Sequence, residues 1–260
     1  MLIDLHNHTP LCNHATGTPQ SYAAAAFAQG CKVFGFSDHA PMDFDQKYRM
    51  SFAQMPLYEA QILELQEFYK GKMEVKLGYE VDFIEDLMDA RVLDAKVDFL
   101  VGSVHFLRGW GFDNPEFIGG FRSKEIDSLW QEYFTAIEAS AKCGKFDIIG
   151  HIDLLKIFNH RPTKDIRLLA ASAVKAVKAA NLVVELNLAG LRKPCNELYP
   201  CDQVLELLAE NDIDITISSD AHAAEQVGAN YDIALDKMRQ FGFTKLAYFT
   251  KRDKAYLPLD

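Results

Sequence analysis

Most histidines in this chain follow short apolar runs with the composition of β-strands, and several have an acidic neighbour. Seven of the eight histidines fit this pattern: His6, His8, His14, His39, His105, His151 and His222. Neutral imidazole is the commonest metal ligand, and imidazole with carboxylate binds catalytic zinc, iron and manganese. A histidine that only packs in a core has no reason to recur at the ends of successive strands. The pattern therefore predicts a metal site.

The remaining ligand candidates are carboxylates in similar positions. His6 and His8 are two residues apart at a strand end, so both imidazoles should point to one side. Glu80 lies within an apolar run, where an unpaired charge is costly, and Asp220 stands two residues before His222 at another strand end. Nine side chains exceed the three or four protein ligands of a single ion. We therefore expect a centre of two or three metals, with Glu80 as a bridge.

Two further residues could bind metal but are weaker candidates. The five cysteines lack CxxC spacing and are odd in number, which is typical of reduced cytosolic thiols. Cys12 lies among the first histidines, so a ligand role stays open, although sulfur would be unusual beside harder ligands. His160 lies beyond the loop that should hold the site, and we expect that it does not bind metal.

Alternating strand and helix patterns must position these residues. Apolar β-rich runs predict strands at 2–6, 32–37, 74–83, 98–104, 147–150, 182–187, 214–218 and 245–249. Amphipathic runs predict helices at 19–29, 56–70, 86–95, 123–142, 164–180, 202–211 and 229–240. Seven or eight such units without a flexible linker favour one closed α/β barrel with parallel strands. Residues 40–55 and 107–122 should be excursions from the rim, and the histidines lie at the strand ends where barrel enzymes hold their chemistry.

Composition limits the class of partner. The chain has 260 residues, 49% apolar content and a net charge of −10. A general binder of nucleic acid or anionic membrane usually shows a basic face, so neither is expected as a partner. The first residues lack a basic segment followed by an apolar stretch, and no long apolar run predicts a membrane span. We expect a cytoplasmic protein, whose oligomeric state the sequence does not reveal.

The motifs around these residues resemble those of the PHP (polymerase and histidinol phosphatase) superfamily, and within it the monofunctional histidinol-phosphatases. The resemblance runs nearly end to end. It is carried by Asp4-Leu5-His6-Asn7-His8-Thr9-Pro10-Leu11-Cys12, Phe36-Ser37-Asp38-His39-Ala40-Pro41, Gly78-Tyr79-Glu80-Val81-Asp82-Phe83, Gly102-Ser103-Val104-His105-Phe106, Ile149-Gly150-His151-Ile152-Asp153-Leu154, Glu185-Leu186-Asn187, Gly190-Leu191-Arg192-Lys193-Pro194 and Ser219-Asp220-Ala221-His222.

The resemblance implies a fold and a ligand scheme. The fold would be a distorted (β/α)7 TIM-like barrel, which we expect to form a single domain over residues 1–260. The cofactors would be three divalent transition-metal ions, drawn from Zn, Fe and Mn. One ion would take His6, His8, Glu80 and Asp220; a second would take Glu80, His105 and His151; a third would take His14, His39 and His222.

The resemblance also implies a phosphatase reaction on a small phosphorylated metabolite, L-histidinol phosphate, in histidine biosynthesis. Arg161 and Arg192 are the candidate phosphate-binding residues, because guanidinium matches phosphate in a bidentate manner; Lys193 is expected to be a solvated neighbour. Either Asp220 or His222 could protonate the departing alkoxide. The alternatives are a PHP phosphoesterase acting on nucleotides or other small phosphomonoesters, and a structural metal module.

The cationic substrate should find an acid near the rim. Asp43, Asp45 and Glu197 are the candidates for this role. The aromatic residues of 106–121 (Phe106, Trp110, Phe112, Phe117 and Phe121) either wall the pocket or pack the rim, and the sequence does not decide between these two placements.

Overall fold

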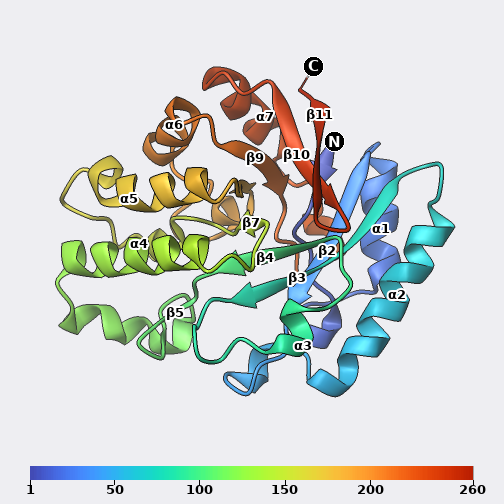
Figure 1. Cartoon of the computed structure of the whole chain (residues 1–260), viewed down its shortest axis with the longest axis horizontal. Coiled ribbons are helices and arrows are strands. Elements are labelled where there is room, and N and C mark those ends of the chain that lie inside the picture. Colours follow the sequence, from blue (N-terminus) through green and yellow to red (C-terminus); the bar gives the residue numbers. More distant parts are fainter. Residues whose placement is uncertain (260) are drawn as a thin grey trace.

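Seven parallel strands curl into a nearly closed barrel in the computed structural model, which describes residues 1–259 (Figure 1). The strands, in their order around the barrel, are β1 (Ile3–Asp4), β2 (Val33–His39), β3 (Glu74–Asp82), β4 (Phe99–Ser103), β7 (Ile148–Ile149), β8 (Val183–Asn187) and β9 (Asp214–Ser218). The edges meet where the amide of Leu5 donates to the carbonyl of Ile217 over 3.3 Å and the amide of His8 donates to that of Ala221 over 3.0 Å. The predicted α/β barrel is confirmed.

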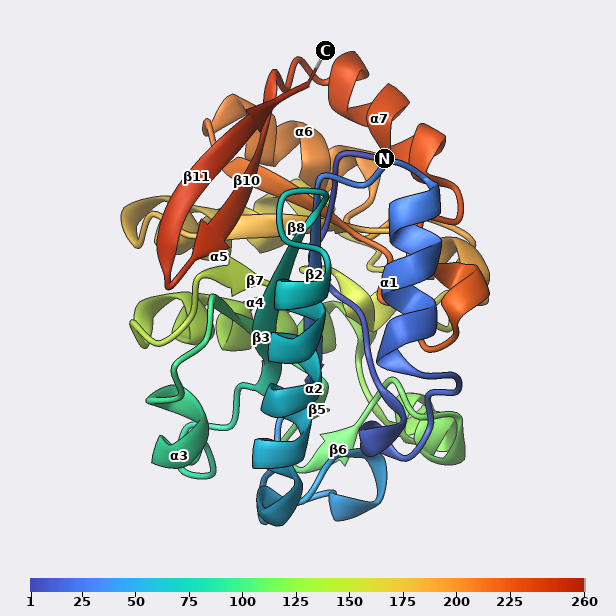
Figure 2. The same ribbon diagram turned by 90° about the vertical axis from the view of Figure 1, so that its right-hand side faces the viewer.

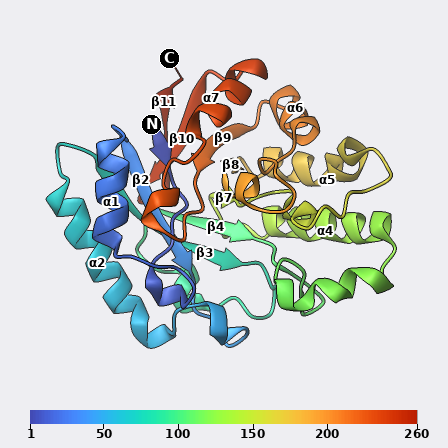
Figure 3. The same ribbon diagram turned by 180° about the vertical axis from the view of Figure 1, so that it is seen from behind.

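Helices cover the outside of the barrel. They are α1 (Pro19–Ala28), α2 (Met55–Phe68), α3 (Ala90–Leu93), α4 (Ile126–Lys142), α5 (Ile166–Ala179), α6 (Asp202–Glu210) and α7 (Tyr231–Gln240). Figure 3 shows α1 and α2 on one side of the strands and α4, α5 and α6 on the other. Within residues 1–259, none of the helices combines the length and the apolar character that crossing a bilayer requires.

The pattern of α4 shows why these segments form surface helices. Its buried side chains recur at helical spacing, so one stripe faces the core while the opposite side faces water. They are Leu129, Trp130, Tyr133, Phe134, Ile137, Ser140 and Ala141. The helix lies beside α5, and the Trp130 indole donates to the carbonyl of His160 over 2.9 Å. This contact fixes the loop that follows β7.

The apolar core has two parts. The larger part lies between β4, β7, β8 and β9 and the helices α4 to α7, and the smaller part lies between β2, β3, α1 and α2. The strands are apolar through most of their length because helices and barrel interior bury both faces. The core therefore holds the strand ends rigidly, and those ends carry the histidines.

Three expectations about the elements were wrong in detail. The segment 245–249 is a strand, β10 (Lys245–Thr250), but it does not join the barrel; it pairs with the unpredicted β11 (Asp253–Pro258) in an antiparallel hairpin outside it (Figure 2). The helix expected at 86–95 is only the short α3. The strands expected at 2–6 and 147–150 are shorter than expected, because each pairs with its neighbours over only two residues.

The two excursions at the rim contain short elements. Residues 40–55 hold short 3-10 helices at Gln46–Tyr48 and Phe52–Gln54. Residues 107–122 hold most of a small hairpin, β5 (Phe106–Leu107) and β6 (Trp110–Gly111), followed by a 3-10 helix at Pro115–Ser123. Both excursions contribute side chains to the cleft described below.

Candidate metal centre

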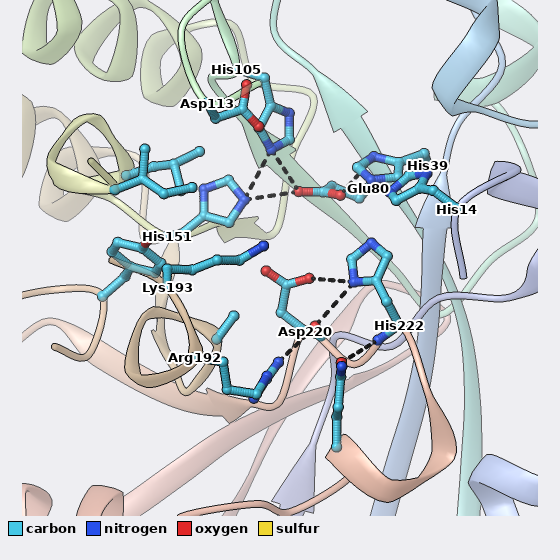
Figure 4. Close-up of a pocket in the computed structure, with 15 residues that line it drawn as sticks. His14, His39, Glu80, His105, Asp113, His151, Arg192, Lys193, Asp220 and His222 are labelled. Carbon is cyan, nitrogen blue, oxygen red and sulfur yellow. Dashed lines mark hydrogen bonds and ion pairs between the residues drawn. The ribbon is translucent and has the colours of Figure 1, made fainter. Parts of the chain in front are cut away.

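The predicted ligands meet at one mouth of the barrel because Glu80 lies near the end of β3 and the others end or follow a parallel strand; Figure 4 shows seven of the nine. His39 is the last residue of β2 and lies in register with Glu80 on β3. His105 and His151 each stand two residues beyond the end of their strand. Residues that are far apart in sequence thus share one cluster, as the sequence predicted.

The first group of ligand atoms belongs to His6, His8 and Glu80, whose donor atoms all lie within 4.8 Å of one another. Nε2 of His6 is 3.3 Å from Oε2 of Glu80, and Nε2 of His8 is 3.8 Å from the same oxygen. Asp220 joins this group, because its Oδ1 lies 3.1 Å from Nε2 of His8. These are the four residues expected to share one ion.

The second group is Glu80, His105 and His151. Oε1 of Glu80 lies 3.0 Å from Nε2 of His151 and 3.5 Å from Nε2 of His105. The two imidazole nitrogens are 3.2 Å apart. Glu80 therefore turns one oxygen toward each group, which is the geometry that a bridging carboxylate needs.

The third group is His14, His39 and His222, and it lies nearer the solvent than the other two. Cys12 is buried beside it and forms a further close set with His8 and His222. Burial would raise the pKa of the Cys12 thiol, but hydrogen bonds with His14 and His8 lower it below its usual value. All five cysteines are free thiols.

Three acidic residues orient the imidazoles from behind, and sequence reasoning assigned them no role. Nδ1 of His6 lies 2.9 Å from Glu185. Nδ1 of His105 lies 2.6 Å from Asp82, and Nδ1 of His8 lies 3.3 Å from Asp38. A carboxylate only accepts, so each Nδ1 carries a proton, and Nε2 is the nitrogen that faces the centre and would offer its lone pair to a bound cation.

The charged groups of the cluster shift one another's pKa values. Burial would raise the pKa of Glu80, but the surrounding imidazoles, His6 foremost, hold it well below its usual range. Burial opposes the charged form of His105, yet the carboxylates of Asp82 and Glu80 raise its pKa to about 10. Burial also lowers the pKa of His39 to about 4. The cluster keeps its carboxylates ionised in a desolvated place, and such charges need cations beside them.

The donor set fits divalent metal ions. Nε2 of His6 and Oε2 of Glu80 are buried and have no hydrogen-bond partner among the described residues, although they face each other. Buried polar atoms in folded proteins are nearly always satisfied. Nε2 of His105 and Nε2 of His151 also lie 3.2 Å apart and face the same point, where a cation could accept both lone pairs. Nitrogen and carboxylate donors suit Zn, Fe and Mn.

The backbone at Asp220 is unusual. Its φ is 48°, in the left-handed region that residues other than glycine seldom adopt. Such conformations persist where the surrounding structure holds them, and they gather at functional sites. Here the Asn187 amide holds the side chain by donating to Oδ2 of Asp220 over 3.2 Å.

The two candidate arginines have different surroundings. Arg192 lines the cavity above the histidines; its Nη2 donates to the carbonyl of Ser219 over 2.7 Å, and its buried Nη1 has no partner among residues 1–259. Arg161 does not line this cavity, and its guanidinium pairs with Glu197. Lys193 is exposed, as expected, but Figure 4 shows its side chain reaching into the cavity.

The remaining candidates divide between the site and the core. The His160 ring stacks on Phe121 with a centroid distance of 3.9 Å and belongs to none of the ligand groups. Phe112 is fully buried and Phe121 nearly so, and both pack in the core. Phe106 and Phe117 instead line a cleft beside the histidines. Some aromatic residues of this loop therefore line the pocket and others pack in the core, so both of the placements considered from the sequence occur.

Comparison with known proteins fixes the family. The PHP domain model matches residues 4–189, which is more than half of the chain. The chain belongs to the PHP family. A probable histidinol-phosphatase of Deinococcus radiodurans is 39% identical over 246 residues, covering 93% of this chain and 94% of that protein. The histidinol-phosphatase of Bacillus subtilis is 28% identical, covering 90% and 98%.

A solved structure agrees with this PHP barrel in fold. The histidinol phosphate phosphatase of Lactococcus lactis, complexed with zinc, L-histidinol and phosphate, superposes with a TM-score of 0.78 at 20% identity. The match covers 98% of this chain and 100% of that one. The resemblance inferred from the motifs is thereby confirmed.

Proposed function

We propose that this PHP protein hydrolyses L-histidinol phosphate to L-histidinol and inorganic phosphate, with divalent transition-metal ions held by the nine clustered side chains. The observation that carries the proposal is the convergence of imidazole Nε2 atoms on both oxygens of Glu80, beside the guanidinium nitrogen Nη1 of Arg192, which has no partner among the described residues. The names of the relatives support the choice of substrate.

The ligands divide into three metal positions. His6, His8, Glu80 and Asp220 would hold one ion; Glu80, His105 and His151 a second; and His14, His39 and His222 a third. When bound, such ions make a water nucleophilic near neutral pH and neutralise phosphoryl oxygens.

The other residues bind and orient the phosphate. Water attacks phosphorus in line with the ester oxygen, the P–O bond to the alkoxide breaks, and the alkoxide takes up a proton. Nη1 of Arg192 donates to a phosphoryl oxygen while Nη2 stays on the backbone of Ser219, so the guanidinium is fixed before the substrate arrives. Either Asp220 or His222 takes the proton that the attacking water gives up and returns it to the alkoxide; both line the cavity, and their pKa values lie well below their usual range, so both begin deprotonated.

The substrate assignment is tested by phosphate release. L-histidinol phosphate and a panel of nucleoside monophosphates are compared, with metal-stripped protein as the control. Histidinol phosphate should have the highest kcat/KM. A preference of more than about 10-fold for nucleotides would replace the substrate while leaving the chemistry intact.

The ligand assignment is tested by one variant inside the cluster and one outside it. Glu80→Ala should abolish turnover without unfolding the protein, because Glu80 serves two ligand groups. His160→Ala should have little effect, because His160 lies outside every group. Circular dichroism checks the fold of both. Equal losses of activity would mean that the ligands have been sorted wrongly.

A further inference from the structure

The cleft above the histidines consists of two lobes that share a wall. The inner lobe encloses about 340 Å³ and is lined by Arg192 and by seven of the nine proposed metal ligands. The outer lobe encloses about 460 Å³ and is lined by the two rim excursions. The residues that line both lobes are His14, His39, His105, Asp113 and Lys193. A molecule with its phosphate in the inner lobe would extend past this wall into the outer one.

The outer lobe has the chemistry of a site for a cationic, partly aromatic group. Tyr48, Phe106 and Phe117 supply aromatic side chains, and Tyr48 already has the Lys47 ammonium 4.7 Å from its ring centroid. Aromatic faces attract cations and stack on other rings. Four carboxylates line the lobe, Asp45, Asp82, Asp113 and Glu116, against one arginine and one lysine, Arg49 and Lys193. An anionic group would bind poorly there, whereas an ammonium or imidazole group would bind well.

Among the described residues, Asp113 is the carboxylate of the outer lobe that pairs with no lysine or arginine; its charged neighbour is the imidazole of His105. The other acids of the outer lobe are each paired: Asp45 and Asp82 with Arg49, and Glu116 with Lys47. Within residues 1–259, no hydrogen bond or ion pair joins the Asp113 carboxylate to another side chain. Figure 4 shows it beside His105, on the wall common to both lobes. A partly buried carboxylate without a partner is costly, and a bound cation removes that cost.

We propose that Asp113 binds the ammonium group of the substrate, and that it selects phosphomonoesters that carry a cation a few bonds from the ester oxygen. The inference rests on the proposed function, and it names the residue that selects the substrate. Asp113 replaces the acids expected from sequence: Asp43 lies outside both lobes, Asp45 pairs with Arg49, and Glu197 pairs with Lys156 and Arg161.

The test is Asp113→Asn, assayed on L-histidinol phosphate and on 3-(imidazol-4-yl)propyl phosphate, which lacks the amine. The ratio of their kcat/KM values should fall by about 10- to 100-fold, because a charged hydrogen bond is lost on one substrate only. Asp43→Asn, an exposed acid outside the cleft, is the matched control and should keep the ratio of the unmodified protein. An unchanged ratio in the Asp113 variant overturns the proposal.

Two further measurements distinguish failure of the Asp113 proposal from failure of the proposed function. Metal content by elemental analysis should be the same in Asp113→Asn and the unmodified protein; a lost ion would make Asp113 a metal ligand and overturn the proposal. If the unmodified protein does not hydrolyse histidinol phosphate, the proposed function fails on its own. The ratio is then taken on 3-aminopropyl phosphate against propyl phosphate, where no preference for the amine in the unmodified protein would overturn the role of Asp113.

Discussion

At the scale of single residues, the centre depends on side chains that never touch a substrate. Glu185 shows this most clearly. Its Oε2 faces Nδ1 of His6, and its Oε1 accepts from the amide of His151 over 2.7 Å and from the Asn187 side chain over 2.7 Å. The Glu185 carboxylate therefore orients the imidazole of His6 in the first group and fixes the backbone of His151 in the second group. Removing such a partner typically lowers metal affinity or activity by about 10- to 100-fold.

Glu185→Gln tests this positioning role. The amide would have to place its NH2 group against Nδ1 of His6, which would drive the imidazole proton to Nε2, the atom that faces Glu80. We expect metal affinity to fall by about 10- to 100-fold, measured by competition with a chromophoric chelator. Glu59→Gln is the control, because Glu59 bonds only the Tyr79 hydroxyl in the described structure, away from the ligands. Equal affinities in the two variants would contradict the role.

The sequence revealed ligands more readily than their partners. A histidine or acid at a strand end is visible by its type and position, so the nine side chains that cluster at the barrel mouth could be named in advance. Glu185 is 179 residues from His6, and only the closed barrel brings them together. Asp113 was missed for a similar reason, since an acid in an irregular loop has no periodicity that indicates which way it points. Arg161 and Arg192 looked alike in sequence and differ only in what surrounds them.

At the scale of elements, a buried ion pair fixes the loop after β7 against the segment before α6. Lys156 is fully buried; its ammonium donates to Asp153 over 2.7 Å and to the carbonyl of Leu198 over 2.6 Å. The same Asp153 oxygen accepts from the amide of Cys201 over 2.8 Å. Tyr199, inside this segment, lines the inner lobe. The pair thus supports one wall of the cavity.

Lys156→Met should therefore destabilise the protein strongly. Removing one partner leaves Asp153 buried and uncompensated, which typically costs about 3–5 kcal/mol of unfolding free energy. Urea denaturation followed by fluorescence measures the loss. Lys70→Met is the comparison, because its pair with Glu67 is exposed and should contribute nothing measurable. If both variants unfold at the same urea concentration, the ion pair does not hold the loop.

Strong periodicity also explains which elements were predicted well. The long amphipathic helices α4 and α5 fall within a few residues of expectation because their buried stripes are continuous. The strand β10 was placed in the barrel only by its composition. In the structure β10 pairs with β11 in a separate hairpin. The alternation of apolar and polar residues within one strand does not reveal which strand it pairs with.

At the scale of the whole molecule, the net charge of −10 disfavours the approach of anions, and the barrel mouth gathers further acidic side chains. A phosphate ester enters such a field only if cations reverse it locally. Arg192 and Lys193 supply part of that positive charge, and the ions held by the cluster would supply the rest. The same cations would also neutralise the buried carboxylates, so binding and stability are coupled through one set of residues.

Metal removal should therefore lower the melting temperature as well as the activity. An ion that binds only the folded state stabilises it by about 2.7 kcal/mol at 100 times its Kd, which corresponds to about 5–10 °C for a chain of this size. Scanning calorimetry of stripped protein titrated with Zn²⁺ or Mn²⁺ measures this rise. Glu80→Ala should lose most of the rise because it disrupts two ligand groups, whereas His160→Ala should keep all of it. The metal centre would be refuted by a stripped protein that hydrolyses phosphate esters and melts at the same temperature with and without metal. In that case the buried Nε2 of His6 and Oε2 of Glu80 would not need a cation.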